Sequence, residues 1–583
     1  MARKSNMRKR TLGVTTIIAA MLAVSSLEAQ VSKTPSQLGP PPASREAQKE
    51  IPVDPAKIRT HVKFLASDLL EGRGTGQRGG DIAADYIATQ FALYGLKPAG
   101  DQGTYFQNVP MVAVKTLEGT SFNFVAPDVG VMTLKNLEDF VTSNESQTEA
   151  AFIDAPIVFV GYGIRAPEYN WDDYKNADLT GKVALLFLNE PPSDNPKFFK
   201  GKALSYYGGA AYKFEETARR GAIATLVIHR ADLAGYSWDV LRNSWGKERS
   251  YLQRDSKAKL RAASWIQSEA ARNLVAMAGL DLDKLFEEAQ SKDFQPVELP
   301  VRLQARVASQ VRPFVGKNVL AVLLSRGPGA TEAVLYSAHY DHLGVDPDRS
   351  GHNIYNGAVD NATGCAVLLE LARTWSETTK MPLRMILFAA LTAEDQGLLG
   401  SEYLAMHSPV APGKISLDLS FDTLKSIGDP EEVVVPGAER TTFYPAVEET
   451  AKTLGLTIRP EARPEGGFCY RSDRFNLARV GIPSFSISEG LKFKGHDEAW
   501  GEAQEHDYLE HRYHQPTDQF LPGMDFTGDA KLATFGYELG AQAASQVKLV
   551  GWLPGDEFDV VRKESQPFER KAAPPRKKTP PHK

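Results

Sequence analysis

An uninterrupted apolar run, MILFAAL at residues 385–391, is the feature that most limits how this chain can fold. Before it, residues 361–374 (NATGCAVLLELART) carry small and apolar residues at helical spacing, and a shorter helical segment begins at Leu398. A short apolar strand at 334–338 and a strand at 417–421 continue an alternation of strands and helices that starts near residue 300. The alternation predicts an α/β fold, a mainly parallel sheet with helices on both faces.

The ends of these predicted strands carry acidic residues and a histidine. They are His339 and Asp341 after the first strand, Asp360 ahead of the following helix, Glu394 and Asp395 after the second strand, and Asp422 after the third. Functional sites in parallel sheets gather beyond the carboxyl ends of the strands. Adjacent carboxylates near buried surroundings repel each other, so this edge needs positive charge. Two divalent cations would supply it.

Imidazole and carboxylate groups suit zinc. Two metals about 3.5–4 Å apart can activate water and hold a substrate carbonyl, and one carboxylate must then bridge them. Asp360 is the natural bridging candidate, and His514 in RYHQPTD (512–518) offers a further ligand. Successive side chains at a strand end point in opposite directions. We therefore expect Asp395 to bind metal and its neighbour Glu394 to move a proton.

Five segments taken together resemble the co-catalytic zinc aminopeptidases, a family that includes glutamate carboxypeptidase and the transferrin receptors. They are AHYDHLG (338–344), NGAVDNATGCAVLLELAR (356–373), AEDQGLLGSEYL (393–404), SFDTL (420–424) and RYHQPTD (512–518). The resemblance covers about residues 300–545 and the leading helices, and implies a fold of the zinc exopeptidase type. It implies two zinc ions per chain, with Mn²⁺ or Co²⁺ as alternatives.

The resemblance assigns the metal ligands residue by residue. Asp360 would bridge both zinc ions, His339 and Asp422 would complete one site, and Asp395 and His514 the other. Many relatives have Glu-Glu where this chain has Glu394-Asp395, which puts the geometry of one site in doubt. Asp418 competes with Asp422, and the family spacing favours Asp422.

Four other residues receive roles from the same resemblance. Glu394 would be the general base, and Asp341 would accept a hydrogen bond from His339 and fix its tautomer. Tyr513 is a candidate for polarising the scissile carbonyl. Arg471 in CYRSDRF is a candidate for substrate binding, with a structural ion pair as the alternative.

The domain organisation follows from shifts in composition and pattern. Residues 55–130 read as the N-terminal part of the peptidase domain, 131–295 as an insert, and 296–560 as the zinc peptidase domain. The insert, with segments such as VFVGYGIRAPEYNWDDYKNADLTGKVALLFL, resembles a protease-associated domain, which is smaller and β-rich or α+β. Such domains are usually non-catalytic.

The two ends of the chain differ from its body. A basic start and a short apolar stretch predict a signal peptide at 1–29, with a single membrane anchor as the alternative. A linker (30–54) follows, and the basic, Pro-rich tail 561–583 is expected to be disordered. The mature protein is therefore expected to be exported, periplasmic or secreted, without a stable membrane span. Cys365 and Cys469 are expected to be unpaired.

The implied function is release of N-terminal residues from peptides by a two-zinc, Glu-assisted mechanism. A carboxypeptidase or dipeptidase on the same scaffold is the alternative, because the metal ligands do not separate these activities. A non-catalytic binding protein would lack ligands, yet every candidate ligand is present. No G-x-S-x-G or H-E-x-x-H pattern occurs. The net charge of -5 disfavours nucleic acid.

Overall fold

The computed structural model describes residues 53–253, 260–327, 329–379, 381–461 and 467–566. The predicted signal peptide (1–29), most of the predicted linker and the tail beyond residue 566 lie outside the described residues.

Four parallel strands form the centre of the peptidase sheet. In the order β17 (Arg384–Leu391), β14 (Gly329–His339), β18 (Ile415–Phe421) and β21 (Ser484–Glu489), each pairs in parallel with its neighbour. Antiparallel strands flank them, among them β13 (Val297–Leu323) beside β17 and β19 (Glu432–Val434) beside β21. The predicted α/β class with a mainly parallel core is confirmed, and the antiparallel flanks make the whole sheet mixed.

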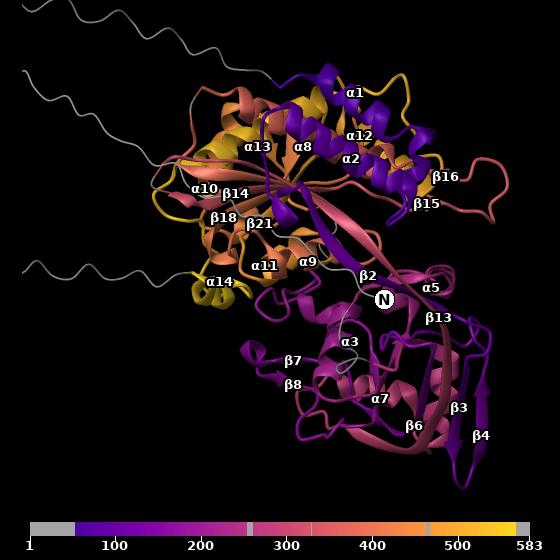
Figure 1. The fold of residues 1–583 in the computed structure, drawn as a ribbon. Helices are drawn as coiled ribbons and strands as arrows, with labels where there is room; N and C mark the ends of the chain where they lie inside the picture. The colour runs from indigo at the N-terminus through magenta and orange to yellow at the C-terminus, as the bar shows by residue number, and fades with distance from the viewer. Residues whose placement is uncertain (1–52, 254–259, 328, 380, 462–466, 567–583) are drawn as a thin grey trace, which may run out of the picture. The chain divides into compact units, whose positions relative to one another are not determined.

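Helices cover both faces of this sheet (Figure 1). One layer contains α1 (Pro55–Leu65), α2 (Arg78–Leu93), α8 (Thr363–Glu377) and α13 (Thr527–Ser545), and the other contains α9 (Leu399–His407), α11 (Arg474–Arg479) and α14 (Asp559–Ser565). The first layer and the sheet share the largest cluster of buried apolar side chains. In α1 the buried residues Ile58, Val62 and Leu65 recur at helical spacing, so one apolar stripe faces the core.

A second sheet lies within the inserted region. Its order is β4 (Gly130–Leu134), β3 (Ser121–Ala126), β13, β6 (Ala150–Phe159), β9 (Val183–Phe187), β10 (Ala224–His229), β12 (Ala262–Gln267) and β5 (Phe140–Ser143). Helices α3 (Ala210–Arg219), α6 (Ser268–Met277) and α7 (Leu282–Ala289) accompany it. Its own apolar core draws on residues from Phe122 to Val307. This core extends beyond the predicted bounds 131–295 at both ends.

Strand β13 belongs to both sheets. Its first part, up to Ala308, pairs with β6 and β3, and its second part pairs with β2 (Phe106–Thr116) and β17. The remaining elements are β1 (Lys97–Pro98), β7 (Arg165–Ala166), β8 (Trp171–Asp172), β11 (Arg249–Leu252), β15 (Gly344–Val345), β16 (Ile354–Tyr355), β20 (Thr457–Ile458), α4 (Ala231–Ala234), α5 (Trp238–Trp245), α10 (Tyr444–Thr453) and α12 (Glu498–His511).

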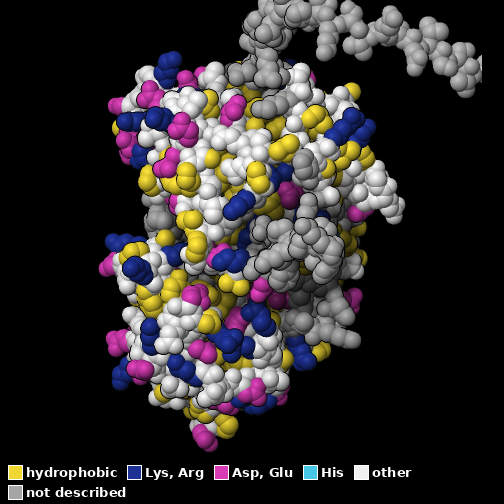
Figure 2. Space-filling view, turned by 90° about the vertical axis from the view of Figure 1, so that its left-hand side faces the viewer, with side chains coloured by type: hydrophobic (Ala, Val, Ile, Leu, Met, Phe, Trp, Pro, Cys, Tyr) yellow, Lys and Arg dark blue, Asp and Glu magenta, His cyan; other side chains and the backbone are white. Residues whose placement is uncertain are grey.

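The molecular surface carries charge of both signs. On the face drawn in Figure 2, Lys and Arg side chains are interspersed with Asp and Glu side chains rather than gathered in one patch. This face therefore creates no large field of one sign. Within the described ranges, no helix is both long and apolar enough to cross a membrane.

Candidate metal centre

The carboxyl ends of β14 and β18 bring one histidine and two aspartates together. His339 is the last residue of β14, and Asp422 follows the last residue of β18. The Nε2 atom of His339 lies 3.2 Å from Oδ1 of Asp360 and 3.4 Å from Oδ1 of Asp422. Three of the predicted metal ligands therefore face one small volume at the sheet edge.

The other predicted ligands meet on the opposite side of Asp360. The Nε2 atom of His514 lies 3.1 Å from Oδ2 of Asp360 and 3.2 Å from Oδ1 of Asp395. Asp360 thus presents one oxygen to the His339–Asp422 pair and its second oxygen to the His514–Asp395 pair. This is the arrangement that a carboxylate bridging two cations requires.

The spacing of these atoms fits zinc. Ligand atoms bonded to a tetrahedral zinc at roughly 2.0–2.1 Å lie about 3.3 Å from one another. The four nitrogen–oxygen distances run from 3.1 to 3.4 Å. Imidazole nitrogens and carboxylate oxygens are also the donor types that zinc accepts. Both the geometry and the chemistry of the residues therefore fit two zinc ions that share Asp360.

Main-chain and amide hydrogen bonds hold Asp360 in place. The carboxylate of Asp518 accepts from the main-chain nitrogen of Val359 at 3.0 Å and from that of Asp360 at 3.1 Å. The side chain of Asn361 donates to the carbonyl oxygen of Phe421 at 3.0 Å and accepts from the nitrogen of Gly364 at 2.9 Å. These bonds tie the start of α8 to the end of β18, which sets the separation of Asp360 and Asp422.

The prediction that the Asp341 carboxylate accepts a hydrogen bond from His339 is wrong about the accepting atom. The Nδ1 atom of His339 lies 3.1 Å from the main-chain oxygen of Asp341, not from its carboxylate. That carboxylate accepts instead from the Thr392 hydroxyl at 2.5 Å and from the main-chain nitrogen of Ala393 at 2.8 Å. Buried main-chain donors need partners, and the turn after β17 supplies two donors to this acid. Asp341 therefore fixes the turn that leads into Glu394.

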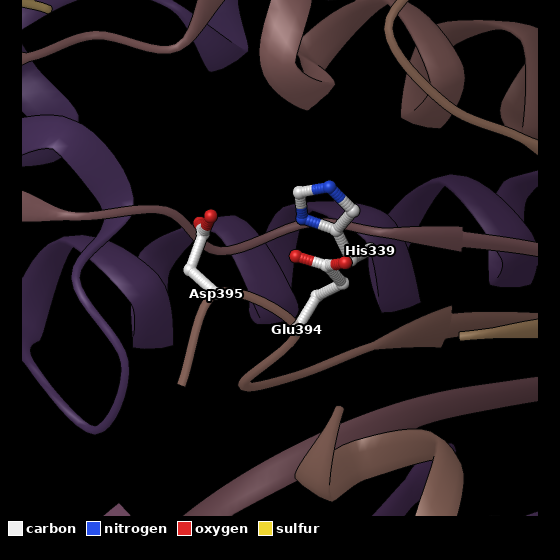
Figure 3. A group of neighbouring side chains, drawn as sticks. All are labelled: His339, Glu394 and Asp395. Atoms are coloured by element: carbon white, nitrogen blue, oxygen red, sulfur yellow. The ribbon is translucent and has the colours of Figure 1, made fainter. Parts of the chain in front are cut away.

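Glu394 and Asp395 lie in that turn rather than on the strand. Strand β17 ends at Leu391, and Ala393 has a φ of 59°. The expected alternation of side-chain direction is wrong, because it applies only to extended backbone. Figure 3 shows the carboxylates of Glu394 and Asp395 on the same side of the turn as the imidazole of His339. Potential ligand atoms of these three residues lie within 4.8 Å of one another.

The electrostatics of this cluster show a surplus of negative charge. Burial raises the pKa of Glu394 well above its ordinary value, and the nearby carboxylates of Asp395 and Asp422 add to the rise. Burial alone would lower the pKa of His514, but its hydrogen bonds to Asp360 and Asp395 raise it to about 11. A proton on the ring nitrogen of His514 must leave before that nitrogen can bind a cation, so metal binding here is coupled to proton release.

Three further residues named from the sequence are now placed. Asp418 accepts hydrogen bonds from the hydroxyls of Ser337 (2.9 Å) and Ser484 (2.5 Å) within the sheet, so it does not compete with Asp422. The ring of Tyr513 stacks on that of His514, with centroids 3.9 Å apart. Arg471 is exposed, and its charge slightly offsets a rise in the pKa of Tyr513 that burial causes.

Comparison with known proteins agrees with this geometry. Residues 318–524 match the family model described as Peptidase family M28. This part of the chain is an M28 peptidase domain. The expected family is thereby confirmed, and the matched range contains every predicted ligand.

Individual relatives of the M28 domain are aminopeptidases and metalloproteases. Leupeptin-inactivating enzyme 1 of Streptomyces exfoliatus is 34% identical over 151 residues, which are 25% of this chain and 32% of that protein. Aminopeptidase YwaD of Bacillus subtilis is 26% identical over 367 residues, 61% of this chain and 70% of that protein. The chain thus spans about a third of the first relative's length. A solved aminopeptidase from Aneurinibacillus sp. strain AM-1 has a TM-score of 0.48 at 18% identity, covering 85% of this chain and 95% of that chain.

Two residues near the M28 centre escaped the sequence reasoning. Arg73 is fully buried and donates to main-chain oxygens of Tyr340, Asn356 and Gly357, which lie on either side of the site. His342, interpreted from the sequence as an ordinary surface or core residue, is also buried, and its Nδ1 atom lies 2.9 Å from Asp395. A signal existed for His342, because it stands in the motif AHYDHLG, but a lone histidine there has no ligand spacing of its own.

Proposed function

We propose that the chain is an exported metallo-exopeptidase that removes N-terminal residues from peptides with the help of two zinc ions. The observation that carries the proposal is the position of Asp360. One of its oxygens lies 3.2 Å from His339 and the other 3.1 Å from His514. Each histidine also contacts a second aspartate, at 3.4 Å and 3.2 Å, and Glu394 lies near His339 and Asp395. Aminopeptidase YwaD among the relatives supports the same activity.

The residues of the chain divide the chemistry between them. Bound zinc supplies Lewis acidity, which polarises a carbonyl group and activates water. Glu394 takes the proton of the attacking water on its carboxylate and passes it to the leaving amine. Its raised pKa in the cluster suits an acid that must also give the proton back. Asp341 holds the turn that carries Glu394. Tyr513, whose ring stacks on that of His514, would donate from its phenol to the scissile carbonyl.

A carboxypeptidase or dipeptidase is the second candidate, and it depends on an arginine that would hold a substrate carboxylate. Arg474 donates to the main-chain oxygen of Pro436, and Arg512 is paired with Asp518 at 3.1 Å. Arg471 is exposed, and the alternative would use it to hold the substrate carboxylate. The aminopeptidase proposal predicts that Arg471→Ala leaves turnover of free-amine substrates largely intact.

The deciding experiment uses two substrate panels. Amino-acid p-nitroanilides carry a free amine, and N-blocked peptides carry only a free carboxyl end. Each panel is tested with the enzyme as purified, after chelation, and after zinc is restored, with Glu394→Gln as a variant that keeps the ligands. We expect cleavage of free-amine substrates only, lost on chelation, restored by zinc, and reduced at least about 100-fold in Glu394→Gln. Cleavage of the blocked peptides alone would assign a carboxypeptidase.

Metal content decides the cofactor part of the proposal. Metal analysis of the purified protein is expected to give two zinc ions per chain, and chelated protein reloaded with Mn²⁺ or Co²⁺ tests the alternatives. A single bound metal at full activity would contradict the two-zinc mechanism, because Asp360 would then have no bridging role.

Export and the nature of the insert rest on the sequence alone. We propose that residues 1–29 direct export to the periplasm or the medium, and that the insert is a protease-associated domain that shapes access to the site. Sequencing the N-terminus of the exported protein tests the first point, with a start near residue 30 expected. Retention of the full chain in the cytoplasm would contradict it.

A further inference from the structure

The main chain at His342 is anchored next to the proposed metal centre. His342 stands directly after Asp341, one of the residues that shape the site, and its side chain is buried. Its main-chain nitrogen donates to the carbonyl oxygen of Arg73 at 3.1 Å, and it forms an isolated β-bridge with Gly74. The guanidinium of Arg73 in turn binds the main-chain oxygen of Tyr340 at 2.7 Å. The imidazole of His342 therefore starts from a fixed backbone.

The imidazole of His342 contacts the oxygen of Asp395 that is not paired with His514. The distance from its Nδ1 atom to Oδ2 of Asp395 is 2.9 Å, whereas Oδ1 of Asp395 lies 3.2 Å from His514. The rings of His342 and His514 meet edge to face, with centroids 5.5 Å apart. Asp395 is thus held between two histidines, each of which contacts one of its oxygens.

The His342–Asp395 distance is shorter than the other four histidine–aspartate distances at the centre. Charge-assisted N–H···O⁻ bonds span roughly 2.7–2.9 Å, and ligands that share a tetrahedral zinc lie about 3.3 Å apart. The His342–Asp395 distance of 2.9 Å falls in the first range, and the four distances around Asp360 fall near the second. This short distance favours a donor role for His342, although potential ligand atoms of His342, Asp360 and Asp395 also lie within 4.8 Å of one another.

Asp395 needs such a donor because its carboxylate group can rotate. The torsion about the bond from its sp³ Cβ to its sp² carboxyl carbon has a broad minimum, so the carboxylate plane turns easily. A hydrogen bond to Oδ2 removes this freedom and leaves Oδ1 directed at the position next to His514. Aspartate is also one methylene shorter than glutamate, so its carboxylate has less reach with which to correct a wrong angle.

We propose that His342 is a positioning residue that sets the metal affinity of the Asp395–His514 site by fixing the carboxylate of Asp395. This inference rests on the proposed function, since it concerns one of the two zinc sites. His342 acts through Asp395, and the Asp360–His339–Asp422 site does not depend on it. Loss of an outer partner of this kind typically weakens metal binding about 10–100-fold.

The experiment measures zinc binding to the metal-free full-length protein by competition with a chromophoric chelator. Three variants probe the donor: His342→Ala removes it, His342→Asn keeps a nitrogen at the same number of bonds from Cβ as Nδ1, and His342→Gln moves it one bond farther. His506→Ala is the control, because His506 is exposed on α12. Circular dichroism checks that each variant is folded.

We expect His342→Ala and His342→Gln to weaken one of the two zinc sites about 10–100-fold and to leave the other within a few-fold. His342→Asn should recover most of the loss, and His506→Ala should match the parent protein. In an Asp395→Ala background, His342→Ala should have no further effect on the remaining site. These results would separate positioning from a general loss of structure, which the asparagine variant would not repair.

Two results would overturn the proposal. Unchanged affinity at both sites in His342→Ala would show that Asp395 is held without His342. Complete loss of one zinc in both the alanine and the asparagine variants would make His342 a ligand. Neither result depends on turnover, so both are distinct from a failure of the proposed function, which would appear as a parent protein that binds no zinc.

Discussion

At the scale of single residues, the candidate centre depends on side chains that lie just outside the ligand set. Asp341 is the clearest case, because its buried carboxylate accepts from the turn that carries Glu394 and Asp395. The main-chain oxygen of the same residue accepts from His339. One residue therefore orients a ligand from one strand and the proposed base from the next.

Replacing Asp341 with asparagine should reduce catalysis more than binding. The amide offers one acceptor where the carboxylate offers two, so the turn at Ala393 loses a hydrogen bond and Glu394 is less well aimed. We expect kcat to fall about 10–100-fold with a small change in KM, as for other residues that orient a metal site. Steady-state kinetics on a p-nitroanilide substrate measure this. Thr392→Val, which removes only the hydroxyl donor, should show a smaller loss in kcat, and an equal loss would contradict this division of roles.

Arg73 illustrates a second kind of support, in which a charge is used for its hydrogen bonds. Its guanidinium donates to four main-chain oxygens, of Leu65, Tyr340, Asn356 and Gly357. Arg73→Met would remove this donor from all four; Gly357 keeps a second donor, the main-chain nitrogen of Ala362 at 3.2 Å, and each oxygen left unpaired costs about 1–3 kcal/mol. We expect a urea unfolding midpoint well below that of the parent. Arg78→Met, at an exposed position in α2, is the control and should shift the midpoint little.

The identity of the candidate ligands was predictable from the sequence, and their supporting contacts were not. Strand ends in a parallel sheet share one edge, so His339, Asp360 and Asp422 could be brought together from strand order alone. The hydrogen-bond partners of the Asp341 carboxylate could not be predicted, because they depend on the left-handed backbone at Ala393. Alanine rarely adopts this conformation, so the sequence gives no sign of it. His342 was missed for the same reason, since only the fold brings it to Asp395.

At the scale of elements, a glycine lets α13 lie close to the sheet. A side-chain carbon at Gly540 would sit 1.8 Å from the hydroxyl oxygen of Tyr336 on β14. That hydroxyl cannot swing aside, because it donates to the carbonyl oxygen of Gly536 at 3.0 Å and accepts from the indole of Trp375 at 3.1 Å. The helix therefore approaches β14 only because position 540 has no side chain.

Gly540→Ala should destabilise the protein despite the better helix propensity of alanine. The propensity gain is about 1 kcal/mol, whereas overpacking of a core costs about 1–3 kcal/mol and here meets a pinned side chain. We expect a lower melting temperature, measured by calorimetry on the zinc-loaded protein. Tyr336→Phe in the same chain removes the clashing oxygen and should recover part of the loss. A melting temperature raised by Gly540→Ala alone would contradict this packing.

The elements of the peptidase sheet were predictable, whereas the boundaries of the insert were not. Apolar runs such as 385–391 are unambiguous, and β17 extends over Arg384–Leu391. The bounds of the insert, 131 and 295, were predicted from a shift in composition and pattern, but its core begins at Phe122 and ends at Val307. The reason is β13, a single strand that continues from one sheet into the other, with residues that alternate between buried and exposed up to Val307.

At the scale of the whole molecule, buried carboxyl groups make stability depend on pH. Asp418 is fully buried between Ser337 and Ser484, and burial raises its pKa to about 7. Burial likewise raises the pKa of Asp529 to about 7. A carboxyl group whose pKa is higher in the folded state stabilises the protein below the unfolded-state pKa, and this contribution is lost as the pH rises through about 7.

Asp418→Asn should remove part of this dependence. The parent protein should lose stability between about pH 4 and pH 7, and the share of Asp418 is at most about 4 kcal/mol, from a rise of roughly three pKa units. The asparagine variant should gain on the parent as the pH rises through this window. Urea midpoints at several pH values, with zinc present throughout, measure the difference. Asp128→Asn, at an exposed position, is the control, and a difference between Asp418→Asn and the parent that does not vary with pH would refute the assignment.

The pairing of β2 with β13 marks the place where the inserted lobe could be replaced by another domain. Thr116 at the end of β2 lies opposite Ser309 in the antiparallel register, so the entire lobe between them occupies the place of a hairpin turn. Excision at 131 and 295 would leave strand edges without partners, which invites aggregation. Joining Thr116 to Ser309 through a short Asn-Gly turn would instead close β2 and β13 as an ordinary hairpin, although it also removes β11, which pairs with β2. Replacement of this lobe by another domain should therefore start from the paired residues Thr116 and Ser309 rather than from the predicted bounds 131 and 295.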